Sequence, residues 1–119
     1  MKTKIYEAIQ QWIPDSKNWF DFPSTNDETI NQYALLKSVA RFCNEKMDST
    51  DEEEAESAKE VIRVINMLYE SGNQYTRNAI ENEFFTELST QENPASLKKH
   101  LSLLSKESKQ GYLKTLLEN

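Results

Sequence analysis

The chain has 119 residues, enough for one domain with one hydrophobic core and too few for two stable domains. Two glycines and three prolines provide too few turns for a many-stranded β-fold, while a hydrophobic share of 37% is enough to form a core. The formal net charge of −6 argues against nucleic-acid binding, because phosphate contacts require clustered lysine and arginine.

The first predicted element is a short amphipathic helix. Apolar residues recur at three- and four-residue steps from Ile5 to Ile13. Pro14 ends this helix, because the residue before a proline is disfavoured in the helical conformation. A loop over residues 15–24 follows and contains three aromatic residues, among them Phe20. These aromatics either fold over an open end of the core or serve as anchors for a partner.

The second predicted helix starts near Thr25, where Thr25 and Glu28 fit a capping box. Its apolar stripe follows helical spacing and consists of Tyr33, Leu36, Ala40, Cys43 and Met47. Further apolar residues widen the stripe. A helix with so wide an apolar face is expected to lie at the centre of the bundle, in contact with two or more neighbours.

The third helix is expected to begin at a second capping box, formed by Thr50 and Glu53. Acidic residues fill its first turn, where the positive end of the helix dipole favours them. Gly72 is expected to end it as the residue just after the helix, and Asn73 can cap the next one. Because the connections are short, neighbouring helices should be antiparallel or sharply angled.

Three further helices are predicted in the C-terminal part. The fourth covers about residues 74–89, and Asn93 followed by Pro94 marks the start of the fifth. The buried stripe of the sixth is expected to comprise Tyr112, Leu113, Leu116 and Leu117. Gly111 would lie inside that helix at a cost of about 1 kcal/mol relative to alanine. The sequence leaves open whether the last two helices are separate or one kinked rod.

These elements predict an all-α fold. The expected architecture is a single domain over residues 1–119, a bundle of about five to six helices with antiparallel neighbours around a wide apolar central helix. The single cysteine allows no internal disulfide, residues 1–7 lack the apolar run of a signal peptide, and no apolar stretch is long enough to span a membrane. A cytoplasmic protein without membrane association is therefore expected.

Candidate chemistry is sparse. A zinc site needs three or four Cys, His or carboxylate ligands, and the chain has one cysteine and one histidine far apart in sequence. Cys43 belongs to the deepest apolar stripe and is expected to be buried, whereas His100, beside two lysines, is expected to be solvent-exposed. Glycines only at positions 72 and 111 exclude a glycine-rich phosphate loop. We therefore expect no catalytic residue, no metal and no cofactor.

The negative charge is concentrated in one segment. Residues 45–60 hold eight acidic side chains and two lysines, so this segment alone matches the net charge of the whole chain. A solubilising helix start favoured by the helix dipole is one interpretation; a docking surface for a cationic partner is the other, since the charge exceeds what capping requires. The candidate partner-binding residues are Asp48, Asp51, Glu52, Glu53, Glu54 and Glu56, with Phe20 as a candidate aromatic anchor.

Two segments of the C-terminal half carry a resemblance. Residues 78–88 (NAIENEFFTEL) and 103–113 (LLSKESKQGYL) resemble a family of small uncharacterised bacterial helical domains, which are similar to immunity proteins of polymorphic or contact-dependent toxin systems. The resemblance implies a compact helical protein that covers the active site of a toxin. An acidic face opposite a cationic cleft would give fast, salt-dependent association. The resemblance carries no catalytic residue.

The leading functional hypothesis is a non-enzymatic protein-binding module of this immunity or antitoxin type, a monomer or homodimer that binds a cationic toxin domain. The first alternative is a self-associating structural or regulatory helical domain, with the stripe from Tyr33 to Met47 at the dimer seam. The second alternative is an enzyme of unrecognised type, which would require a deep pocket with converging polar groups.

Overall fold

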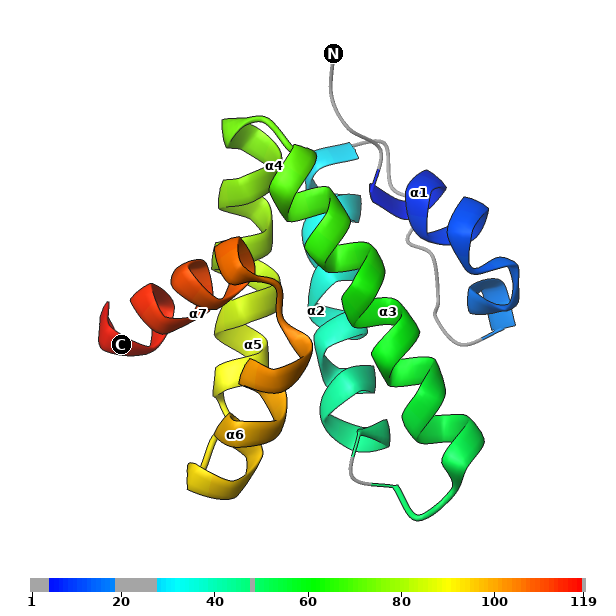
Figure 1. Ribbon diagram of the computed structural model, residues 1–119. Coiled ribbons are helices and arrows are strands. Elements are labelled where there is room, and N and C mark those ends of the chain that lie inside the picture. The colour runs from blue at the N-terminus through cyan, green and yellow to red at the C-terminus, as the bar shows by residue number, and fades with distance from the viewer. Residues whose placement is uncertain (1–4, 19–27, 48, 119) are drawn as a thin grey trace.

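The computed structural model describes residues 5–18, 28–47 and 49–118, and over these ranges the chain is helical with no strand. The elements in chain order are α1 (Ile5–Trp12), the 3₁₀ helix η1 (Pro14–Asn18), α2 (Glu28–Lys46), α3 (Glu52–Ser71), α4 (Gln74–Ala79), the π-helix η2 (Ile80–Phe85), α5 (Thr86–Ser89), α6 (Pro94–Leu103) and α7 (Lys106–Glu118) (Figure 1). Because α4, η2 and α5 follow one another without a break, they form one rod, and the described part of the chain contains six α-helical rods. The predicted all-α bundle is confirmed.

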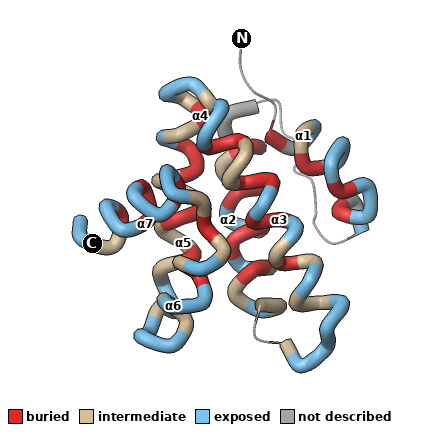
Figure 2. Tube along the Cα trace, in the orientation of Figure 1, coloured by how far each residue is buried: buried red, intermediate tan, exposed pale blue. Residues whose placement is uncertain are grey.

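Helix α2 lies at the centre of the bundle, as its wide apolar face predicted. It contacts α3, the α4–η2–α5 rod and α1. Its side chains Leu36, Ala40 and Cys43 are all 0% exposed. Figure 2 shows the buried residues on the sides of the helices that face one another. Because the chain itself covers these three side chains, they belong to the intramolecular core.

The burial of Cys43 leads to a prediction about its reactivity. Its side chain is fully buried, and burial raises the pKa of the thiol well above its ordinary range. The thiolate is the reactive form, so we expect a disulfide reagent such as DTNB to leave the native protein unmodified and to modify one thiol after unfolding in urea. Rapid modification of the native protein would contradict this placement of α2.

A fully buried glutamine connects α1 to the centre of the bundle. The side-chain oxygen of Gln32 on α2 accepts a hydrogen bond of 2.9 Å from the backbone N–H of Ile5, the first residue of α1. Its amide nitrogen lies 3.5 Å from the hydroxyl of Tyr75 on α4. Because the first N–H groups of a helix have no partner within the helix, Gln32 satisfies one of them in an otherwise apolar environment.

The helix ends partly differ from the prediction. Asp51, not Thr50, caps α3, and its carboxylate accepts a 2.9 Å hydrogen bond from the backbone N–H of Glu53. Gly72 follows α3 with extended backbone angles (φ −76°, ψ 155°) and does not adopt the left-handed conformation typical of a glycine after a helix. Asn73 caps α4 as predicted. Residues 15–18 of the predicted loop belong to the 3₁₀ helix η1, so the loop prediction is wrong there. The aromatic residues of that loop, Phe20 among them, and Thr25 of the predicted capping box lie outside the described residues.

The last two helices are separate. Asn93 caps α6 through a capping box with Ser96, and Pro94 occupies the first turn, as predicted. Leu104 and Ser105 separate α6 from α7. The predicted stripe of the last helix is partly wrong: Tyr112 is buried, but Leu113 is 40% exposed and Leu117 is 87% exposed. Among the described helices, none combines the length and the apolar character that a membrane span needs.

Candidate functional site

The predicted acidic segment forms the first turns of α3 and is open to solvent. Asp51, Glu52, Glu53 and Glu56 are exposed, whereas Glu54 is only partly exposed. Three acidic residues occupy the first helical turn, where they lie next to the backbone N–H groups that have no partner within the helix. The candidate residue Asp48 lies outside the described residues, as does Phe20.

The structure adds one acidic side chain that the sequence did not indicate. Asp15 on η1 lies beside the exposed acids of α3, because α1 and α3 pack together. The residues that line the shallow hollow between these elements are Asp15, Glu53, Glu56, Ser57 and Glu60. Its volume is about 440 Å³. We call Asp15, Asp51, Glu52, Glu53, Glu56 and Glu60 the acidic face.

Nearby cations neutralise part of this charge. Lys46 on α2 forms an ion pair with Glu54 at 3.3 Å. Arg63, which follows the acidic segment on α3, forms one with Glu56 at 3.5 Å. Within the described ranges, Glu52, Glu53 and Glu60 take part in no ion pair and keep an uncompensated charge.

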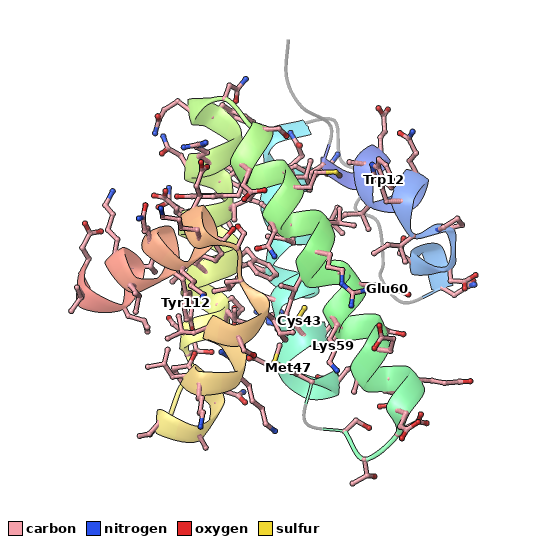
Figure 3. All side chains as sticks on the ribbon, in the orientation of Figure 1. Trp12, Cys43, Met47, Lys59, Glu60 and Tyr112 are labelled. Atoms are coloured by element: carbon pink, nitrogen blue, oxygen red, sulfur yellow. The ribbon has the colours of Figure 1, made fainter. Side chains whose placement is uncertain are left out.

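One large aromatic side chain is exposed on α1, the helix that precedes Asp15. Trp12, at the end of α1, is 61% exposed. Figure 3 labels Trp12 on α1 and Glu60 on α3. A large amphipathic ring that stays exposed is typical of an interface anchor, and it can also stack against a guanidinium group.

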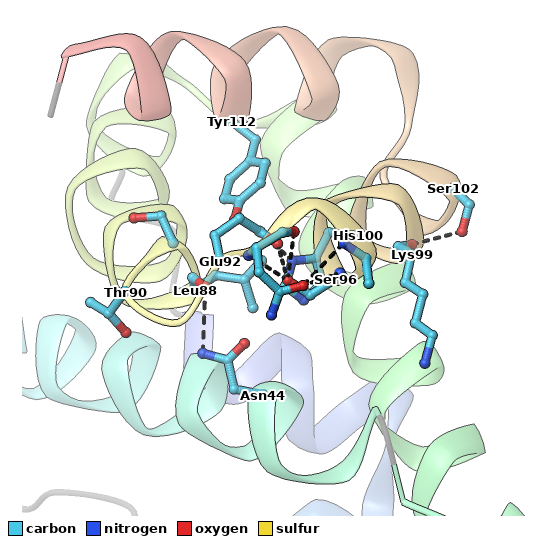
Figure 4. Close-up of polar contacts among 12 residues, drawn as sticks. Asn44, Leu88, Thr90, Glu92, Ser96, Lys99, His100, Ser102 and Tyr112 are labelled. Atoms are coloured by element: carbon cyan, nitrogen blue, oxygen red, sulfur yellow. Dashed lines mark hydrogen bonds and ion pairs between the residues drawn. The ribbon is translucent and has the colours of Figure 1, made fainter.

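The prediction for His100 is wrong, because the structure buries it inside a polar cluster. His100 is 4% exposed, and its Nδ1 lies 2.6 Å from Oε2 of Glu92. The hydroxyl of Tyr112 donates to the same carboxylate oxygen, and the hydroxyl of Ser96 donates to Oε1 (Figure 4). We call Glu92, Ser96, His100 and Tyr112 the Glu92 cluster. It joins the segment before α6, α6 itself and α7.

The protonation of the Glu92 cluster follows from its geometry. Burial favours the neutral carboxyl group, but the hydrogen bonds from Ser96, Tyr112 and His100 outweigh this effect and lower the pKa of Glu92. The carboxylate can only accept hydrogen bonds, so Nδ1 of His100 carries a hydrogen. Burial, together with the hydrogen bond to Glu92, raises the pKa of Tyr112 well above its ordinary range. All of these donors therefore serve to hold a buried negative charge.

A second cluster of polar side chains surrounds Tyr69 of α3, next to the first residues of the π-helix η2. The Tyr69 hydroxyl donates a 2.6 Å hydrogen bond to Glu81, and burial, with this bond, raises the pKa of Tyr69 to about 12. The guanidinium of Arg77 stacks over the Tyr69 ring and donates to Glu107 and to the carbonyl oxygen of Glu70. π-Helical turns are frequent at functional sites. The cationic group beside this one, Arg77 on α4, already bonds to Glu107 and Glu70 of the same chain.

The acidic face presents carboxylates to solvent. Among the described residues, no three His, Cys, Asp or Glu side chains are grouped so that they could hold a metal ion. His100 is enclosed by its own partners, and the exposed groups of the acidic face are carboxylates on one solvent-facing surface. Such a surface can attract and orient a cationic partner.

Comparison with known proteins identifies a family. No curated protein and no solved structure matches the chain. A family model described as a domain of unknown function, DUF7674, matches residues 6–118, so the chain belongs to the DUF7674 family.

Proposed function

We propose that this protein is a non-enzymatic binding module that recognises a cationic protein through its acidic face. In its specific form, the proposal is an immunity protein that covers a cationic toxin domain in the cytoplasm. The observation that carries it is the set of exposed, uncompensated carboxylates Glu52, Glu53 and Glu60, joined by Asp15 from a different part of the chain. The resemblance of residues 78–88 and 103–113 to domains that are similar to immunity proteins supports the specific form.

The charge geometry supports rapid recognition. Like charges gathered on one surface produce a field that attracts an oppositely charged partner before contact. Trp12 would then supply apolar area and a stacking surface for an arginine, and such contacts determine how long a complex lasts. Trp12 is therefore a candidate aromatic anchor alongside Phe20, which lies outside the described residues and stays a prediction.

The position of the histidine supports binding in place of catalysis. General acid–base catalysis requires the catalytic group to reach the substrate. His100 is 4% exposed and hydrogen-bonded to Glu92, so a substrate in solution cannot contact its ring.

Charge reversal of the acidic face tests the proposal. The binding partner in this experiment is a cationic toxin domain encoded beside this protein, co-expressed and purified with it. We expect a 1:1 complex that inhibits the toxin. Changing Glu52, Glu53 and Glu60 to lysine should lower the association rate constant by about tenfold or more at low salt, because electrostatic steering is lost. Surface plasmon resonance at several salt concentrations measures this rate constant.

A matched variant controls for net charge. Glu45, Glu70 and Glu118 are exposed acids away from the acidic face, and changing all three to lysine alters the net charge by the same amount. This control should keep most of the association rate. Equal losses in the two variants would reject the acidic face, and a chain that binds no neighbouring cationic protein would reject the immunity role.

A further inference from the structure

Helix α6 is held to the bundle in an unusual way. Its only buried residue is His100, whereas α3 has seven buried residues and α7 has four. The other α6 residues are exposed or half-buried, and the half-buried Leu97, Leu101 and Leu103 pack against the core. Hydrophobic burial, which normally attaches a helix, is therefore smaller for α6 than for α3.

Polar contacts take the place of hydrophobic burial. At the start of α6, Ser96 donates to Glu92, and in its last turn His100 donates to the same carboxylate. Tyr112 on α7 donates to it as well, so one buried carboxylate connects α6 to α7. Hydrogen bonds to a buried charge are stronger than neutral ones, and all of them are lost together when the carboxylate is hydrated. Asn66 on α3 adds a single bond to the carbonyl oxygen of Leu103.

We infer that α6 is a strap that opens as a separate unit while the rest of the bundle stays folded, and that the Glu92 cluster is the latch that keeps it closed. Elements with few buried apolar contacts are the ones that open locally at a low cost in free energy. Opening would expose the apolar sides of Leu97, Leu101 and Leu103 and the surface beneath them.

Hydrogen exchange of individual backbone amides tests this inference. In the wild-type protein, we expect α6 amides to exchange at least about tenfold faster than amides in α2 and α3, with a weaker dependence on denaturant, as a sub-global opening requires. Glu92→Gln weakens hydrogen bonds that exist only while α6 is closed. It should therefore favour the opened state and speed the exchange of α6 amides by about tenfold or more.

A core variant far from α6 makes the test specific. Ile9 on α1 is fully buried, and α1 stays packed when only α6 opens. Ile9→Val should therefore speed exchange in α2 and α3 but leave exchange in α6 unchanged. The inference is overturned if α6 exchanges together with α2 and α3 at the same denaturant dependence, or if Glu92→Gln does not alter the exchange of α6.

Discussion

Replacing Glu92 with alanine should lower the free energy of unfolding by about 2–4 kcal/mol at neutral pH, because each buried hydrogen-bond donor that loses its acceptor costs about 1–3 kcal/mol. The change leaves the Tyr112 hydroxyl and Nδ1 of His100 without their acceptor, and it leaves a cavity where the carboxylate lay. Urea denaturation followed by far-ultraviolet circular dichroism measures the loss.

The same cluster should make the stability depend on pH. The pKa of Glu92 is lower in the folded state than its ordinary value of 4.5. Its stabilising contribution is therefore fully present above pH 4.5 and disappears as the pH falls through the lower, folded pKa. Glu92→Gln cannot ionise. The difference in unfolding free energy between wild type and Glu92→Gln should thus be constant near neutral pH and shrink below pH 4.5.

Glu45 provides the control for both measurements. It is an exposed acid on α2, so Glu45→Ala should change the unfolding free energy by less than about 0.5 kcal/mol. If Glu92→Ala costs no more than Glu45→Ala, or if the difference between wild type and Glu92→Gln grows on acidification, the carboxylate is not buried and ionised as described.

The sequence predicted the helices well because the signals for them are local. Apolar residues three and four positions apart placed the central helix, and the pairs Asn93–Pro94 and Gly72–Asn73 marked two of the breaks. Capping chemistry depends on residues within one turn, so it can be read from the sequence. Where several capping residues occur together, as at Thr50 and Asp51, the sequence alone could not select the one that caps.

The Glu92 cluster was missed because Glu92 lies in the turn before α6 and Tyr112 belongs to the next helix, so helical periodicity does not bring them together with His100. His100 follows two lysines, and this local pattern is typical of an exposed position. Its burial depends on Glu92, eight residues earlier in the segment before α6, and on Tyr112, which reaches the cluster from the next helix. The same limitation applies to Asp15, which joins the acidic face only because α1 packs against α3.

Helix α7 shows a second limit of hydrophobic patterning. Its buried positions include Ser108, Gly111 and Thr115, while Leu113 and Leu117 are exposed. The reason is the close packing of α7 against η2 and α3, which leaves room only for small side chains on that face apart from Tyr112. A pattern based on apolar residues therefore assigned part of the wrong face to the core.

Gly111 is the position where this close packing should have the largest effect. By helix propensity alone, Gly111→Ala would stabilise the protein by about 1 kcal/mol. In the structure, the added Cβ would collide with the hydroxyl of Tyr69, and it would lie 2.9 Å from Cζ of Tyr69 and 3.1 Å from Cε2 of Phe85. Phe85 is fully buried among other aromatic rings and cannot move aside freely. We expect a net loss of about 2–3 kcal/mol, as is typical of an overpacked core.

Two companion variants separate packing from propensity. Gln110 is the exposed neighbour of Gly111 on α7, so Gln110→Ala should change the unfolding free energy by less than about 0.5 kcal/mol. Tyr69→Phe removes the hydroxyl that the new Cβ would meet, at the cost of its bond to Glu81. The double variant should therefore lose less stability than the sum of the two single changes. Urea denaturation measures these changes. At the close approach described, the collision of the new Cβ outweighs the gain in helix propensity. A stability gain for Gly111→Ala would therefore mean that α7 does not approach α3 and η2 so closely.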